Sequence, residues 1–494
     1  MKKTVFTHLL ATLSVLIMPH LAQATNGMNM EGYGPIALGL GGASMAYDNG
    51  TAAVINNPAT LGLAAQGARL DLALGFLGPD VQSRQGAMDW TSDADAFYMP
   101  AFGWSRKQGR LSYGIASFAQ GGMGTEFDIG PGATLAANLM SGGNTFTGAG
   151  SPSAGTIAAA GSLQERTEIG VGRLMLPLAY EVTDRLILGG TADFVWATMD
   201  LQMVMSGKQM GDMAGQGLIG GNMMAALQAA MTSGAVNDVY YGYFDFSDNN
   251  DFTGKARTTG FAAKIGLVYR FDERLRFGAT YHAKVQLDKF DGRARVNMAV
   301  SADSGYLSGA PLSGSYVDAV FPLRGDIVIK DFSWPAMLAA GLAWQASEQW
   351  FITADVKHIN WSDAMKSFSM DFKTDGSPQN GAFANLTLKA VMPQDWQDQV
   401  VVHAGVALKA TSQLTLRTGV NIADNPVPDR TLLYLFPAIV ENHYTAGVEY
   451  AFNTRQGVNF ALSYAPEVTA TNPVTGIETR HSQLNWQVMY SHLF

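Results

Sequence analysis

Histidine is the side chain that most readily exchanges a proton or binds a metal near neutral pH. Beyond residue 24 the chain has six, and they are spread along the sequence: His282, His358, His403, His443, His481 and His492. None lies in a recognisable nucleophile motif, and such spacing fixes no catalytic geometry. The sequence has no metal-ligand cluster, phosphate-binding loop or dinucleotide fingerprint. We therefore expect no enzymatic activity, no metal and no cofactor.

Methionine is concentrated in one stretch, the predicted loop 204–256 together with the end of the predicted strand that precedes it. Seven of the 24 methionines fall within it: Met203, Met205, Met210, Met213, Met223, Met224 and Met231. Residues 218–231 predict a short amphipathic helix, and Phe244 and Phe246 continue the apolar character. Because methionine is flexible and polarizable, this stretch could form a docking groove for apolar molecules of varied shape. Packing between loop helices is the alternative explanation.

Composition excludes several classes of protein. The 494 residues have a net charge of −9, with 15% charged and 47% apolar residues, 55 glycines and no cysteine. Disordered chains are poorer in apolar residues, and a disulfide scaffold needs cysteine. The negative net charge offers no basic footprint, so we expect no nucleic-acid partner.

Residues 1–24 have the order of a secretory signal peptide. Lys2 and Lys3 precede an apolar run from Val5 to Ile17, and the small residues of Ala22-Gln23-Ala24 follow. The run is shorter than the ~20 residues that a membrane-spanning helix needs, which disfavours the alternative of a membrane anchor. We expect cleavage after Ala24.

From residue 68 onward, apolar residues alternate with polar or small ones in segments of about ten residues, as in transmembrane strands. One such segment places four apolar side chains on one face and four small or polar ones on the other: Leu275, Phe277, Ala279 and Tyr281 against Arg276, Gly278, Thr280 and His282. A soluble two-sheet sandwich would alternate in the same way, so the connections between strands must distinguish the two folds.

Short polar turns alternate with long connections along the chain. The long ones cover 78–94, 119–165, 204–256, 290–325, 370–396, 424–440 and 466–480. Six short turns and seven long loops predict fourteen antiparallel strands, and this asymmetry is typical of outer-membrane barrels with periplasmic turns and extracellular loops. The last strand ends on Phe494, an aromatic terminus common in such barrels. We therefore expect 68–494 to form a transmembrane β-barrel in the outer membrane of a Gram-negative bacterium.

Residues 25–67 precede the first predicted strand. They are rich in glycine and carry only two charged residues, Glu31 and Asp48. A disordered periplasmic tail is one interpretation. A barrel this wide needs a plug, however, and the near absence of charge favours a compact insert packed inside the lumen.

The chain resembles the outer-membrane long-chain fatty-acid transporters of the FadL type, a family that includes uptake channels for toluene and other hydrocarbons. Three runs and the terminal aromatic strand carry the resemblance: the glycine-rich segment closing with Asn57-Pro58-Ala59, Gly121–Phe127 and Leu416–Pro428. It implies a monomeric fourteen-stranded barrel closed by an N-terminal hatch. It also implies ligand capture at extracellular loops, transfer to a lumenal pocket and release through a side opening at a kink in the third strand.

On this chain the kink would fall at Gln120, Gly121 and Gly122, and the hatch latch at Asn57, Pro58 and Ala59. Glycine inside a strand independently marks a bulge or bend. The alternative is that these glycines merely begin a loop.

The resemblance also places basic residues near the lumenal pocket, where a carboxylate would sit. The corresponding positions here are Thr198 and Gln397, neither of them basic. Because a buried carboxylate without a partner is costly, neutral hydrocarbons become favoured ligands. Four lumenal cations could substitute as head-group partners or could simply pair with acids across the wall: Lys264, Lys284, Lys357 and Arg417.

These expectations combine into a passive uptake channel for hydrophobic compounds. Its partners would be a hydrophobic small molecule, outer-membrane lipid with lipopolysaccharide, and the barrel-assembly machinery. A general diffusion porin is the main alternative, and a lipid hydrolase on the barrel wall is a further one.

Overall fold

The computed structural model describes residues 26–86, 88–128, 164–250 and 254–494. The predicted signal peptide and most of the predicted loop 119–165 lie outside these residues. The described strands form a closed antiparallel ring, which confirms the predicted all-β barrel. In order it comprises β1 (Gly67–Gln85), β3 (Phe97–Gln108), β4 (Leu111–Asp128), β5 (Gln164–Glu181), β6 (Leu186–Ser206), β9 (Ala256–Arg270), β10 (Leu275–His282), β14 (Met337–Gln345), β15 (Trp350–Ile359), β18 (Gln399–Lys409), β19 (Leu414–Ala423), β20 (His443–Ala451), β21 (Gln456–Thr471) and β22 (Glu478–Leu493), which pairs with β1.

The sheet as a whole is larger than predicted. Within the described residues it has 22 strands rather than fourteen, because segments expected to be irregular loops also pair. The additional strands are β2 (Met88–Thr91), β7 (Ile219–Gly220), β8 (Val236–Phe246), β11 (Gln286–Leu287), β12 (Phe290–Asp303), β13 (Tyr316–Lys330), β16 (Ser367–Thr374) and β17 (Thr387–Pro393). The expected loop starts at residues 78 and 119 were also wrong, since β1 continues to Gln85 and β4 to Asp128.

Side chains alternate between the two faces of the wall, as successive residues of a strand must. On β5, Leu176, Leu178 and Tyr180 are exposed, whereas Met175 and Ala179, on the alternate positions, are buried. The exposed apolar residues form the belt that a barrel presents to lipid, and the buried positions face the lumen.

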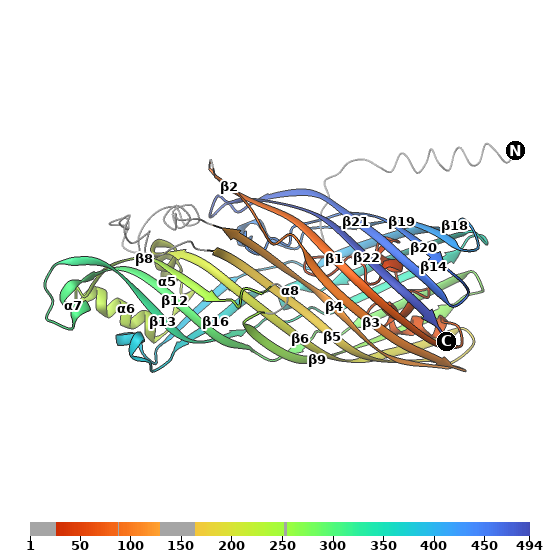
Figure 1. The fold of residues 1–494 in the computed structure, drawn as a ribbon, viewed down its shortest axis with the longest axis horizontal. Coiled ribbons are helices and arrows are strands. Elements are labelled where there is room, and N and C mark those ends of the chain that lie inside the picture. Colours follow the sequence, from red (N-terminus) through yellow and green to blue (C-terminus); the bar gives the residue numbers. More distant parts are fainter. Residues whose placement is uncertain (1–25, 87, 129–163, 251–253) are drawn as a thin grey trace.

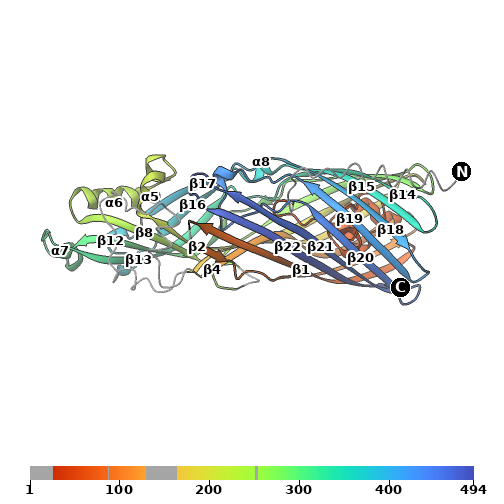
Figure 2. The same ribbon diagram turned by 90° about the horizontal axis from the view of Figure 1, so that it is seen from above.

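The two ends of the barrel differ. The short turns and the C-terminus lie at one end, and the helices of the long connections lie at the other (Figure 1; Figure 2). Those helices are α5 (Gly207–Gly215), α6 (Asn222–Thr232), α7 (Ser304–Ser308) and, nearer the ring, α8 (Trp361–Ala364), with 3₁₀ turns η3 (Pro378–Phe383) and η4 (Asp429–Thr431). Helix α6 confirms the helix expected within 218–231. Among the described residues no helix is long and apolar enough to cross a membrane.

The N-terminal segment, residues 26–66, packs against the ring near the end with the short turns (Figure 1). It contains α2 (Pro35–Leu38), η1 (Gly50–Val54) and η2 (Pro58–Leu63), and nearly all of it is buried. Its hydrogen-bond partners come from strands all around the ring: Asp71, His282, Asp355, His403, Thr445 and Asn485.

Glycines in the wall let this segment approach closely. Gly189 of β6 and Gly266 of β9 are paired across the sheet. A Cβ on Gly266 would lie 2.0 Å from Asn57 Oδ1, and one on Gly189 would lie 2.6 Å from the backbone nitrogen of Ala59. We call this glycine pair the wall notch.

Candidate functional site

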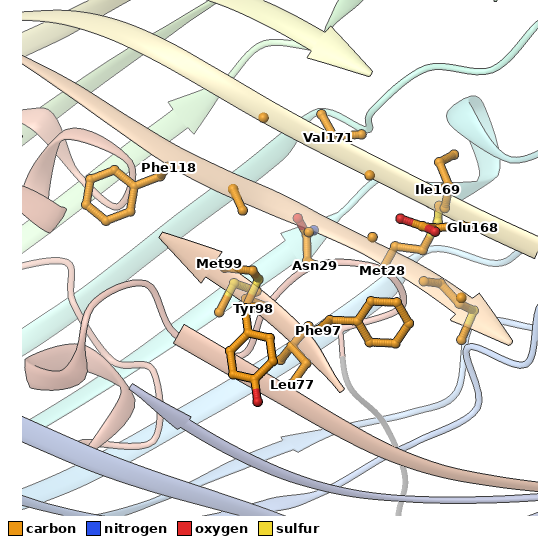
Figure 3. Close-up of a pocket in the computed structure, with 18 of the residues that line it drawn as sticks. Met28, Asn29, Leu77, Phe97, Tyr98, Met99, Phe118, Glu168, Ile169 and Val171 are labelled. Atoms are coloured by element: carbon orange, nitrogen blue, oxygen red, sulfur yellow. The ribbon is translucent and has the colours of Figure 1, made fainter. Parts of the chain in front are cut away.

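A cavity lies beside the N-terminal segment at strands β3, β4 and β5 (Figure 3). Its volume is about 420 Å³. Most of the lining side chains are apolar, among them Met28, Phe97, Phe118, Ile169 and Val171. We call it the side cavity.

The side cavity is lined by residues from both faces of the barrel wall. Strand β3 pairs with β4 only as far as Phe102 opposite Ser117, although β3 begins five residues earlier. The lining of the side cavity includes Met28 of the N-terminal segment. It also includes Tyr98 and Trp196, whose side chains are exposed on the outer face. The side cavity therefore lies where β3 and β4 are not paired, which we call the gap.

The predicted kink in β4 coincides with this gap. The register between β4 and β5 shifts between Ala119 and Gly121, which places a bulge at Gln120. Gly121 has φ 152°, a value that few other residues tolerate, and a Cβ there would lie 2.1 Å from the carbonyl oxygen of Met28. Both Gly121 and Gly122 line the side cavity.

The N-terminal segment holds the bulge. The Tyr33 hydroxyl donates to the carbonyl oxygen of Gln120, and Gln120 Nε2 donates to Asn29 Oδ1 at 3.2 Å. Burial raises the pKa of Tyr33 well above its usual value, so the hydroxyl stays protonated and remains a donor. The shape of the wall at the gap therefore depends on contacts with this segment.

Four residues of the predicted docking groove line a small apolar void at the other end of the molecule: Met203, Met205, Phe244 and Phe246. This void measures about 20 Å³. A neighbouring void of about 40 Å³ shares Leu201, Phe246, Met370 and Met392 with it. We call the two together the outer voids.

The remaining methionines of that group pack rather than line the outer voids. Met210 and Met223 are buried in the main apolar core, and Met213, Met224 and Met231 pack against it partly buried. The methionines of this stretch therefore pack in or against the core, and two of them also line a small void.

The four candidate cations do not converge. None lines the side cavity among the described residues. Three are in ion pairs: Lys264 with Asp193, Lys284 with Asp363, and Arg417 with Glu449. Lys357 has no ion pair within the described part of the chain, and Thr198 lines the side cavity as a neutral residue.

The predicted latch, Asn57-Pro58-Ala59, sits in the wall notch. Asn57 caps η2 by accepting from the backbone nitrogen of Ala59 at 3.1 Å, and its Nδ2 donates to the carbonyl oxygens of Met45 and Leu267. The motif therefore ties the N-terminal segment both to itself and to β9.

A further element escaped the sequence analysis. Residues 424–442, which we call the inserted loop, join β19 to β20, and Leu432, Leu435, Phe436 and Ile439 within it are buried. The loop crosses to the opposite wall, where the carbonyl oxygen of Leu435 accepts from the hydroxyls of Thr125 and Thr167. The run of apolar residues in this loop suggests burial, but it has neither the spacing of a helix nor that of a strand, so the sequence does not distinguish it from a surface loop.

No catalytic arrangement emerges from the histidines. His282 and His403 each bond a backbone carbonyl of the N-terminal segment, at Asn56 and Gly41 respectively. Within the residues that the structure describes, no three side chains are placed to hold a metal ion.

Comparisons with known proteins agree with this geometry. A family model described as outer membrane protein transport protein (OMPP1/FadL/TodX) matches residues 20–489. The crystal structure of the Pseudomonas putida toluene transporter TodX has a TM-score of 0.74 and 26% identity, covering 95% of this chain and 100% of that chain. The crystal structure of the Ralstonia pickettii toluene transporter TbuX has a TM-score of 0.70 and 27% identity, covering 94% of this chain and 99% of that chain.

A curated relative is more distant. The long-chain fatty acid transport protein of Escherichia coli O6:H1 is 23% identical over 308 residues, which is 62% of this chain and 61% of that protein. The chain spans less than two thirds of the length of the curated relatives that it matches.

Proposed function

Because the chain belongs to the outer membrane protein transport family that includes FadL and TodX, we propose that it is a passive channel carrying small neutral hydrocarbons inward through the outer membrane of a Gram-negative bacterium. The observation that supports the proposal is the side cavity, a mostly apolar space beside the unpaired stretch of β3 and β4. Ligand would enter at the outer voids, move to the side cavity and leave sideways between β3 and β4.

One feature supports a sideways exit over passage along the barrel axis. The interface between the N-terminal segment and the ring is polar, with buried partners such as Asp355, His403 and Asn485. An apolar ligand passing there would disrupt those bonds, each of which is costly to leave unmade. The segment, residues 25–67 by its predicted bounds, would then serve as a hatch that closes the lumen, with Asn57-Pro58-Ala59 as its latch.

The lining of the side cavity favours neutral ligands over fatty acids. Its described residues include Glu31 and Glu168 but no lysine or arginine. A ligand carboxylate buried beside them would lack a counter-charge, and burying such a charge is strongly unfavourable. The TodX and TbuX relatives are toluene transporters by name, and toluene is the probe we choose.

Uptake by intact cells tests the proposal. Gram-negative cells without a family member of their own would express this chain and receive radiolabelled toluene or hexadecanoate. We expect toluene to enter faster than in cells lacking the chain, and hexadecanoate to gain little. Faster entry of small sugars than of toluene would contradict the proposal and indicate a porin.

A pair of tryptophan variants tests the side exit. Gly170 lines the side cavity, and a Cβ there meets only Thr198 Oγ1, at 3.8 Å. Gly170→Trp should therefore fill the cavity without displacing backbone and should reduce toluene uptake to the background of cells lacking the chain. Ala446→Trp adds the same side chain to the exposed face of β20, away from the cavity, and should leave uptake unchanged. Equal uptake by both variants would sink the side exit.

A further inference from the structure

The outer voids and the side cavity come close to each other on strand β5. Thr167 lines the outer voids, Ile169 lines the side cavity, and Glu168 between them lines both. Residues two apart in a strand are separated by about 7 Å. Only a thin partition therefore divides the two apolar spaces.

The inserted loop supplies part of that partition. Phe436 lines the outer voids. The carbonyl oxygen of the next residue, Pro437, is hydrogen-bonded to His481 Nδ1 at 2.8 Å, and His481 lines the side cavity. Consecutive residues of the inserted loop thus contact the surroundings of one space and then of the other.

The ring of Phe436 contacts two other aromatic rings. Phe368 meets it edge to face with ring centroids 5.8 Å apart, and Trp396 lies 6.2 Å away. Immediately before it in the chain, the carbonyl oxygen of Leu435 accepts from two threonine hydroxyls of β4 and β5. The hydroxyl of Tyr434 bonds to the Glu165 carboxylate. These hydrogen bonds anchor the loop just before Phe436, whereas the ring itself makes aromatic contacts and can rotate without breaking a hydrogen bond.

We propose that Phe436 sets the maximum width of the ligands that can pass from the outer voids to the side cavity. The inference rests on the proposed transport function and adds to it a residue that selects ligands by size. A flat, narrow molecule can slip past the ring after a small rotation of its side chain. A molecule wide in all directions must displace the anchored loop, and breaking buried hydrogen bonds is costly.

Uptake of a narrow and a wide aromatic probe tests the inference. Cells expressing the chain would receive toluene or 1,3,5-triisopropylbenzene, and the ratio of wide to narrow uptake would be measured. In Phe436→Ala we expect the ratio to rise by about tenfold, the lower range of what changing a pocket group does to discrimination. Toluene uptake itself should change little.

Phe332→Ala is the matched control. Phe332 belongs to the same aromatic cluster, stacked on Phe368 with centroids 6.0 Å apart, but lines neither apolar space. It should leave the ratio unchanged. An equal ratio in Phe436→Ala and wild type, or an equal rise in Phe332→Ala, would overturn the inference.

A second variant covers the case in which Phe436→Ala does not assemble. Replacing Thr125 and Thr167 together by valine removes both donors to Leu435 and keeps the ring. It should also raise the ratio, and an unchanged ratio in a folded barrel counts against the inference. Absence of toluene uptake in wild type would instead overturn the proposed function, and this inference with it, so the two failures are distinguishable.

Discussion

At the scale of single residues, the inserted loop contains a buried acid with an unusual environment. Glu441 is 2% exposed, and its Oε1 has no hydrogen-bond partner among the described residues. Burial, with a smaller contribution from the charge of Asp424, raises the pKa of Glu441 from 4.5 to about 8. The folded loop therefore favours the protonated, neutral carboxyl.

This shift predicts a pH dependence of stability. The unfolded chain releases the Glu441 proton near 4.5 and the folded chain near 8. Between these values the folded state binds more protons, so stability falls as pH rises, by at most about 1.4 kcal/mol per pH unit for one proton. Thermal unfolding in detergent from pH 4 to 9 measures the trend, and Glu441→Gln should flatten it. The same slope in both proteins would refute the assignment.

At the scale of elements, the wall notch shows what the sequence could not supply. Asn57-Pro58-Ala59 was identified as a latch from the family resemblance, but Gly189 and Gly266 were not identified as its receptor. Their pairing depends on the register between β6 and β9, which no local pattern specifies. The inserted loop escaped for the same reason, since its threonine partners lie some 300 residues away in the chain.

The notch gives a prediction about docking of the N-terminal segment. Gly266→Ala places a Cβ 2.0 Å from Asn57 Oδ1, and such overpacking costs about 1–3 kcal/mol. We expect faster amide exchange across Asn57–Thr60 with an intact barrel. Gly170→Ala, whose Cβ has room, is the control and should exchange as wild type does. Unchanged exchange in Gly266→Ala would mean that the segment docks elsewhere.

At the scale of the whole molecule, the closed barrel was predictable from the alternation of apolar and polar residues. Its two unlike ends were predictable from the alternation of short and long connections. Strand number was not, because the connections that looked irregular contain paired strands such as β12 and β13. These strands do alternate: Ala294, Val296 and Met298 of β12 are buried, whereas Arg293 and Arg295 are not. The pattern was missed because it lies inside a connection expected to be an irregular loop. The sequence predicts a side opening at a strand kink, but not the apolar lining, which comes from seven separate segments.

The lipid-facing belt provides a test at this scale. Ile265 of β9 is 64% exposed on the outer face. Ile265→Arg should destabilise the barrel in bilayers by about 2–4 kcal/mol, the range for arginine near the midplane. Val474→Arg, at an 80% exposed position in the turn before β22, should be neutral. Refolding into lipid vesicles at graded urea compares them, and equal midpoints would show that Ile265 does not face lipid.

The length of β6 has a consequence for where a ligand first leaves water. Its 21 residues extend about 70 Å along the strand, or about 50 Å of height at a tilt near 45°, whereas a barrel's apolar belt is only about 25 Å tall. Met203 and Met205 lie near the far end, well beyond the bilayer. A hydrocarbon would therefore move from the aqueous medium directly onto apolar protein surface, without first dissolving in lipid. The solubility of the hydrocarbon in water would then set the concentration gradient that drives its entry.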